Sequence, residues 1–108
     1  MFKPGQIVTV STRNKNYTED GFLTCPIEKN GDMRLYETID LESYPSWNDF
    51  KGKSTKVSDG DVVTVCGLIG RPERIRSGYN FSSYDIYEIL MNGKIRQVFK
   101  HNLFPLEK

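Results

Sequence analysis

Near its end the chain reads Tyr84-Asp-Ile-Tyr-Glu-Ile-Leu-Met-Asn-Gly-Lys-Ile-Arg-Gln-Val-Phe-Lys-His-Asn-Leu-Phe-Pro-Leu106. Asn92-Gly93 lies between two runs rich in apolar residues. It predicts a two-residue type I′ turn, because both central positions of that turn need φ > 0. Pro105 predicts the end of a further strand, since proline donates no hydrogen bond to a strand ladder. The stretch therefore predicts an antiparallel hairpin followed by a short closing strand, which is typical of a small β-barrel.

The composition indicates one small domain. A chain of 108 residues buries roughly 65% of its unfolded surface, which is enough for a core without metal or disulfide support. With 15 Lys and Arg against 14 Asp and Glu, the net charge is +1 and creates no strong overall field for nucleic acid or membrane. Cys25 and Cys66 are the only cysteines, and we expect them to be reduced rather than joined in a disulfide.

Neither a signal segment nor a membrane span is predicted. Residues 1–5 do not form the apolar stretch of a secretory signal. The longest mostly apolar run, Val62–Ile69, is far shorter than the roughly 20 residues that a membrane helix requires. We therefore expect a cytoplasmic protein with no membrane partner.

Two segments begin alike, at Gly5–Val10 and Gly60–Val65, and both are rich in β-branched residues. Asn30-Gly31 offers a second hairpin turn between runs 22–28 and 33–39. An internal duplication explains this similarity between the two segments. The alternative, which we prefer, is that all β-meanders repeat the same succession of strands and turns. Residues 41–56 read as an irregular connection with one helical turn over 47–50, capped by Ser46 and ended by Gly52. No apolar period of 3.6 persists, so an all-β fold follows.

Residues 60–106 resemble the SH3-like and Sm-like small barrels. The resemblance rests on the entry Gly60–Val65, the strand 87–90, the turn 92–94 and the closing Val98 with Leu103-Phe104-Pro105-Leu106. It implies a single 3₁₀ turn over 99–102 and a last strand from Leu103. The same pattern is similar to small uncharacterised proteins encoded by tailed bacteriophages, which implies a virion location if this chain is one of them.

The resemblance has clear departures that bear on function. Phe99 and Asn102 stand where an SH3 domain that binds proline-rich peptides has Pro and Tyr, and no aromatic motif occurs in the first loop. Polyproline recognition is therefore not expected. The paired base-binding loop signatures of Sm-like proteins are not evident either. We expect one domain over 1–108, with a first strand and hairpin in 1–40, the connection in 41–56 and SH3-like closing strands in 57–108. The whole is a mainly antiparallel barrel of five to seven strands with at most one or two short helical turns.

Basic and aromatic residues concentrate in one loop and the following strand. Arginine pairs with phosphate as a planar fork, and aromatic rings stack on unpaired bases. The acidic segment 28–49 holds six acidic residues against two basic ones, so the small net charge hides a dipolar distribution. Alternation places Arg96, Val98 and Lys100 on one face of their strand. These residues predict binding of single-stranded nucleic acid, RNA before DNA, through Arg71, Arg74, Arg76, Tyr79, Phe81, Lys94, Arg96 and Lys100.

A protein–protein adaptor is the alternative function. Small barrels have exposed edge strands, which either need protection or pair with a neighbour. Opposing basic and acidic segments also allow subunits to dock head to tail as a homo-oligomer, for instance in a phage particle or a ring. An enzyme is not expected, because His101 is the only histidine and no nucleophile-elbow pattern occurs. The usual Cys and His spacings of a metal site are also missing, so no cofactor is predicted.

Overall fold

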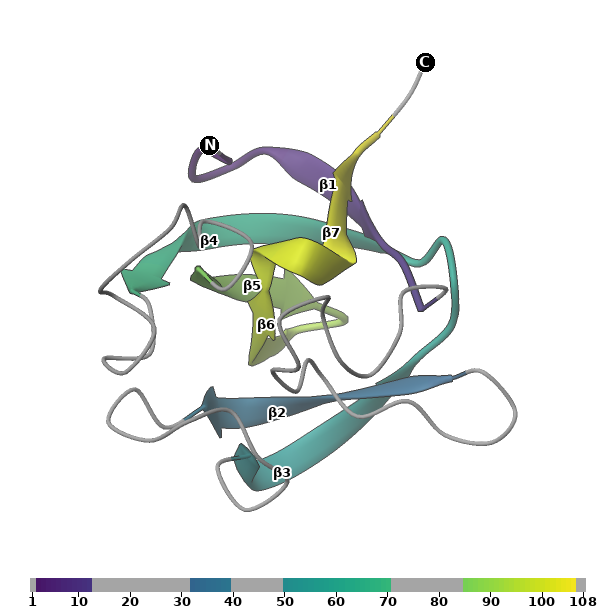
Figure 1. Ribbon diagram of the computed structural model, residues 1–108, viewed down its shortest axis with the longest axis vertical. Helices are drawn as coiled ribbons and strands as arrows, with labels where there is room; N and C mark the ends of the chain where they lie inside the picture. Colours follow the sequence, from purple (N-terminus) through teal and green to yellow (C-terminus); the bar gives the residue numbers. More distant parts are fainter. Residues whose placement is uncertain (1, 13–31, 40–49, 71–84, 107–108) are drawn as a thin grey trace, which may run out of the picture.

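The computed structural model describes residues 2–12, 32–39, 50–70 and 85–106, and its described part is almost entirely antiparallel β-structure (Figure 1). One 3₁₀ turn, η4, covers Lys100–Asn102. The strands are β1 (Ile7–Val10), β2 (Met33–Ile39), β3 (Phe50–Val57), β4 (Val62–Gly70), β5 (Ile86–Met91), β6 (Lys94–Phe99) and β7 (Leu103–Pro105).

The seven strands form one sheet in the order β3-β2-β6-β5-β4-β1-β7. In a flat sheet, four spacings of about 4.8 Å would place β3 and β4 about 19 Å apart. Residues 58–61 form a turn, marked by a 3.1 Å hydrogen bond from Asp61 N to Ser58 O. Such a turn spans less than about 7 Å, and one further residue at each end extends the reach to only about 14 Å. The sheet must therefore curl, and Figure 1 shows β1 and β4 on one side of the molecule and β2 and β3 on the opposite side.

The inner face of the curled sheet holds the core. Alternate residues of β1, β4, β5 and β6 point into it, and each apolar side chain that is fully buried there stabilises the fold by about 1.5–3 kcal/mol. Phe50 of β3 packs edge-to-face on Phe99, with ring centroids 6.3 Å apart. Phe2 packs in the same way on Tyr87, at 5.5 Å. The inner-face residues exposed by 2% or less include Val8, Val10, Val63, Val65, Ile89 and Val98.

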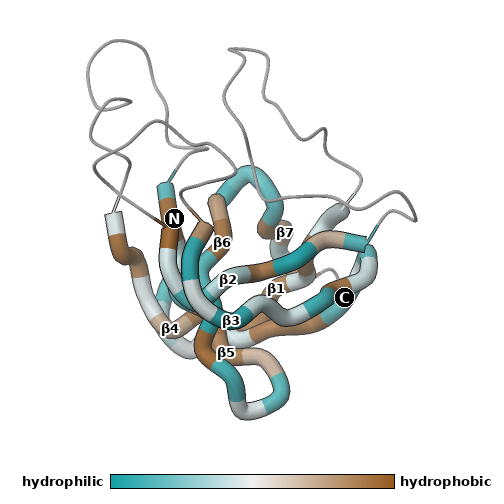
Figure 2. Tube along the Cα trace, turned by 90° about the horizontal axis from the view of Figure 1, so that it is seen from below, coloured by the Kyte–Doolittle hydropathy of each residue, from teal (hydrophilic) through white to brown (hydrophobic). Residues whose placement is uncertain are grey.

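The expected all-β class and the closing hairpin are confirmed. Asn92 has φ +51° and Gly93 has φ +77°, as the type I′ turn requires. Figure 2 shows this hairpin of β5 and β6 projecting from one end of the molecule with a polar tip. The 3₁₀ turn follows with Phe99 as its cap residue, and β7 begins at Leu103 as expected. The count of seven strands is the upper end of the predicted range. β3 and β7 are the two ends of the strand order, so no ladder between them closes the sheet in the described part of the chain.

The expected irregular connection over 41–56 is wrong from residue 50 onward. Phe50 begins β3, and Gly52 lies within that strand instead of ending a helical turn. The segment Lys51-Gly52-Lys53 of β3 has low strand propensity. It forms a strand because β3 pairs with β2, from Met33↔Val57 to Ile39↔Phe50, and the local sequence does not reveal this partner. Cys66 is a free thiol, as expected. The predicted turn at Asn30-Gly31 lies outside the described residues, and so do residues 47–49 of the helical turn predicted over 47–50, whose last residue Phe50 is in β3.

Candidate nucleic-acid interface

Arg96, which the sequence predicts to contact nucleic acid, is largely buried. The residue exposes only 7% of its surface and shares the inner face with Val98, which is fully buried. Its Nε donates a 2.9 Å hydrogen bond to Oγ1 of Thr55, and its Nη1 donates a 2.7 Å bond to the carbonyl of Ile95. The guanidinium is thus held by two bonds in one orientation. Alternation correctly groups Arg96 with Val98, but it does not reveal that this face is the inner one.

Arg96 lines a hollow of about 610 Å³ together with Glu37, Lys53, Ser54 and Lys94. β2 supplies Glu37, β3 supplies Lys53 and Ser54, and the first residue of β6 is Lys94. The hollow therefore lies where the β5–β6 hairpin leaves the sheet and faces the edge strand β3. A site of this kind offers one rigid guanidinium and two long, exposed amines to a ligand.

A β-bulge on β3 shapes this hollow. Tyr36 pairs with Ser54 and Thr38 with Lys51, so Gly52 and Lys53 together face Glu37. Gly52 has φ +87°, and a Cβ there would stand 2.9 Å from the Cβ and the Oε1 of Glu37. Glu37 Oε1 accepts a 2.5 Å hydrogen bond from the backbone N–H of Lys53. Among the described residues that line the hollow, Glu37 is the only acidic one, and one of its oxygens is therefore engaged by the backbone.

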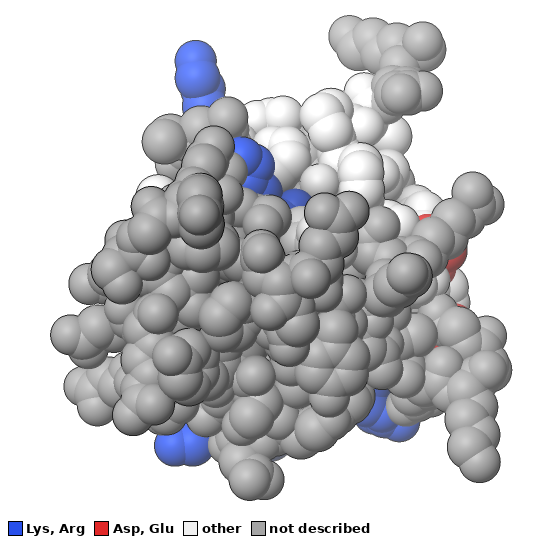
Figure 3. Space-filling model, viewed as in Figure 1, with Lys and Arg blue, Asp and Glu red and all other residues white. Residues whose placement is uncertain are grey.

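The hollow is basic. The strands β2, β3 and β6 hold six basic residues (Arg34, Lys51, Lys53, Lys56, Lys94 and Arg96) and one acidic residue, Glu37. Within the described residues, Lys53, Lys94 and Arg96 have no carboxylate partner within ion-pair distance, whereas Lys56 lies 3.3 Å from Asp32. Figure 3 shows described Lys and Arg side chains along the lower edge, over β2 and β3, and also at the upper left, and acidic ones on the right, by the turn that joins β3 to β4. The uncompensated positive charge favours an anionic ligand.

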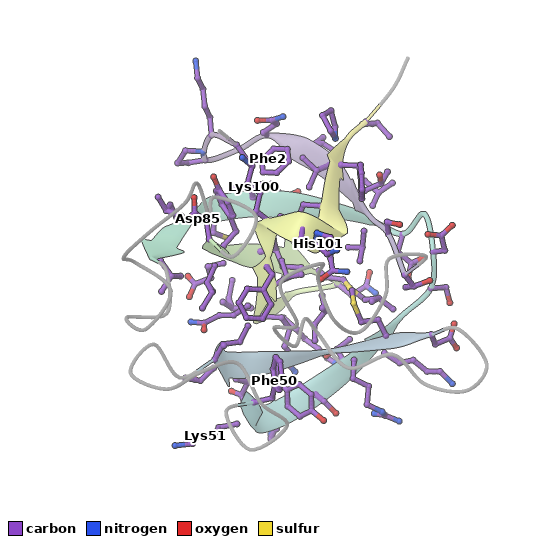
Figure 4. The ribbon with its side chains drawn as sticks, in the orientation of Figure 1. Phe2, Phe50, Lys51, Asp85, Lys100 and His101 are labelled. Carbon is purple, nitrogen blue, oxygen red and sulfur yellow. The ribbon has the colours of Figure 1, made fainter. Side chains whose placement is uncertain are left out.

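Lys100 does not join this cluster. It follows the last residue of β6, whereas Lys94 is the first, so the two lie roughly 20 Å apart along the strand. The backbone N–H of Lys100 donates a 2.7 Å hydrogen bond to the carbonyl of Asp85. Figure 4 shows these two residues beside each other and far from Lys51 at the start of β3.

The remaining predicted site residues belong to segment 71–84 and lie outside the described residues: Arg71, Arg74, Arg76, Tyr79 and Phe81. Lys53 is not among the residues predicted from the sequence, because its segment was interpreted as an irregular connection. The signal that could have found it is the alternation of lysine in Lys51-Gly-Lys53, since alternate residues of a strand share a face.

The metal-binding and titratable side chains of the described residues bear on other kinds of site. No group of three or more His, Cys, Asp or Glu side chains that could hold a metal ion occurs among them. Burial lowers the pKa of His101 below its usual value of 6.5. In the part of the chain that the structure describes, no helix is long and apolar enough to span a membrane.

Comparison of the chain with protein-family models, with curated proteins and with solved structures finds no match.

Proposed function

We propose that this chain is a non-catalytic binding module for single-stranded nucleic acid, RNA before DNA, and that the basic hollow receives a backbone phosphate. The observation that carries the proposal is the group formed by Lys53, Lys94 and Arg96, which approach one another from two strands without a carboxylate partner among the described residues. A nucleic acid presents a phosphate at every nucleotide. A single phosphate-binding pocket therefore positions the strand without reading its base sequence.

The two kinds of basic side chain have different roles in this proposal. Arg96 is pre-organised, because its bonds to Thr55 and Ile95 are made before any ligand arrives, so little side-chain entropy is lost when it binds. Lys53 and Lys94 are exposed and reach the phosphate as mobile point charges. Base stacking is assigned to Tyr79 and Phe81 of segment 71–84, which is the reason for expecting single strands rather than duplex.

The test is fluorescence anisotropy of labelled single-stranded RNA, single-stranded DNA and duplex DNA, titrated with the protein at several salt concentrations. We expect single strands to bind more tightly than duplex. Lys94→Gln is expected to weaken binding about fivefold, or ~1 kcal/mol, and to reduce the slope of log affinity against log salt by about 0.7. Adding Lys53→Gln should reduce the slope by about as much again.

Lys3→Gln is the matched control, because it also removes one exposed lysine but lies in the segment before β1. It should leave the salt slope and the affinity close to those of the wild type. Equal losses in Lys94→Gln and Lys3→Gln would show that only total charge matters and would remove the hollow from the site. Arg74→Ala combined with Arg76→Ala tests segment 71–84 separately, and an unchanged affinity there would exclude that segment from the interface.

A further inference from the structure

The outer face of the sheet carries a second feature, which is apolar and lies away from the basic hollow. Ladder pairing places Ile7 beside Thr64, Thr64 beside Leu90 and Leu90 beside Ile95. Each of the apolar members of this row is exposed by 40–50%. The row crosses four strands in succession, β1, β4, β5 and β6.

A neighbouring row extends the same surface. Thr9 of β1 pairs with Val62 of β4 on one side and with Phe104 of β7 on the other. Val62 is 55% exposed and Phe104 is 43% exposed. We call the two rows together the outer apolar surface: Ile7, Thr9, Val62, Thr64, Leu90, Ile95 and Phe104. None of these residues is charged, although 27% of the chain is.

The edges of the sheet are poor sites for association, which leaves this face as the better candidate. The edge strand β3 carries Lys51, Lys53 and Lys56, and a row of lysines disfavours strand addition. The other edge, β7, has only three residues and includes Pro105, which donates no ladder hydrogen bond. Pairing of strands between two molecules is therefore disfavoured at each end of the strand order.

We propose that the outer apolar surface binds the same surface of a second copy of this chain, forming a two-fold symmetric dimer. A surface without charge meets its own copy without like-charge repulsion, which a two-fold contact requires because each patch faces itself. The five apolar side chains expose on the order of 450 Å², close to the largest apolar patch of an ordinary monomer. Two such surfaces bury at most about 900 Å² in total, which is below the usual size of a specific interface and corresponds to a weak, concentration-dependent dimer.

This dimer is separate from the proposed nucleic-acid site. Ile95 and Leu90 face outward, whereas Arg96, the next residue along β6, faces inward and lines the hollow. A nucleic acid in the hollow therefore leaves the outer apolar surface free. Failure of either proposal leaves the other standing, because self-association is measured without nucleic acid and Lys94→Gln does not alter this surface.

The test is sedimentation equilibrium of the full chain without nucleic acid, from about 5 to about 500 µM, the range in which a small interface associates. We expect the mean mass to rise from the 12.5 kDa of one chain toward twice that value. Leu90→Glu places like charges at the contact and should raise the dissociation constant at least tenfold. Ile95→Glu is the second variant in case Leu90→Glu does not fold, as judged by circular dichroism.

Leu68→Glu is the matched control. Leu68 is also an exposed leucine, 46% against 40% for Leu90, but it lies beyond the bulge of β4 and outside the outer apolar surface. It should associate like the wild type. The proposal is overturned if the wild type keeps the mass of one chain over the whole range. It is also overturned if folded Leu90→Glu or Ile95→Glu associates as strongly as Leu68→Glu.

Discussion

Arg96 of β6 is hydrogen-bonded to Thr55 of β3 across the whole width of the intervening strand β2. The ladder between β2 and β6 has the fewest registered pairs in the sheet, namely the single pair Tyr36↔Gln97. Two side chains of β6 reinforce it. Arg96 reaches β3 on the inner face, and Oε1 of Gln97 accepts a 2.8 Å hydrogen bond from the N–H of Ile39. The Arg96 side chain thus links β3 to β6 and also lines the basic hollow.

Thr55→Val tests the structural part of this role. The valine has nearly the same shape but leaves Nε of the buried guanidinium without its acceptor, which costs about 1–3 kcal/mol of unfolding free energy. Urea denaturation is the measurement. Thr38→Val makes the same change at an exposed position of β2 and should stay within about 0.5 kcal/mol of the wild type. Equal values for the two variants would show that the bond to Thr55 contributes nothing to stability.

Gly52→Ala tests the bulge beside the hollow. The added Cβ would stand 2.9 Å from Glu37, and φ is +87°, so strain and a clash act together. Gly60 has φ +90° and open space at the same position, so Gly60→Ala meets the strain alone, about 1–2 kcal/mol. Thermal or urea unfolding should show Gly52→Ala to be the less stable of the two by about 1 kcal/mol or more. If the two alanine variants unfold alike, Glu37 does not occupy the bulge.

Gly93→Ala tests the type I′ turn. Gly93 has φ +77° and no atom within 4 Å of the position that an added Cβ would take, whereas Gly67 has equally open space without a positive φ. Gly93→Ala should therefore destabilise the fold by about 1–2 kcal/mol, and Gly67→Ala should be neutral or slightly stabilising. Melting temperatures of the two variants are the measurement. A melting temperature of Gly93→Ala equal to that of the wild type would contradict the positive φ at Gly93.

His101 introduces a dependence of stability on pH. Burial lowers its pKa in the folded protein below the ordinary 6.5, so the unfolded chain binds a proton more readily than the folded one does. Stability is complete above pH 6.5 and falls as the pH drops from 6.5 to the lowered folded pKa, because protonation favours unfolding there. His101→Gln should lose this part of the dependence. Unfolding in urea at about pH 7.5 and about pH 5.5, on either side of the ordinary histidine pKa, measures it. If the wild type and His101→Gln lose the same unfolding free energy between these two pH values, other groups are responsible for the pH dependence.

The closing hairpin could be predicted from the sequence because its cause is local. Asn92 and Gly93 are the residues that tolerate positive φ, and the apolar runs beside them need no distant partner to be recognised as strands. The strand β3 could not be predicted in the same way. Lys51-Gly52-Lys53 has little strand propensity of its own, and it becomes a strand only because β2 lies beside it.

Some residues of the candidate site could likewise be predicted from the local sequence, and others could not. The sequence identifies Lys94 and Arg96 as basic residues of the last hairpin, but the same alternation also groups Lys100 with them. The 3₁₀ turn ends that alternation, since Lys100 is its first residue. Lys53 joins the site from a strand far away in the sequence, and no local pattern links the two strands.

By itself, therefore, the sequence determined the all-β class, the hairpin turn and the short closing strand, because turn chemistry and alternation act over a few residues. Only the tertiary structure decided that Arg96 faces the interior and that Lys53 lies near Lys94. It also decided that Ile7, Leu90 and Ile95 form one exposed row. These relationships depend on the register between strands far apart in the chain, and the curl of the whole sheet sets which face becomes the inner one.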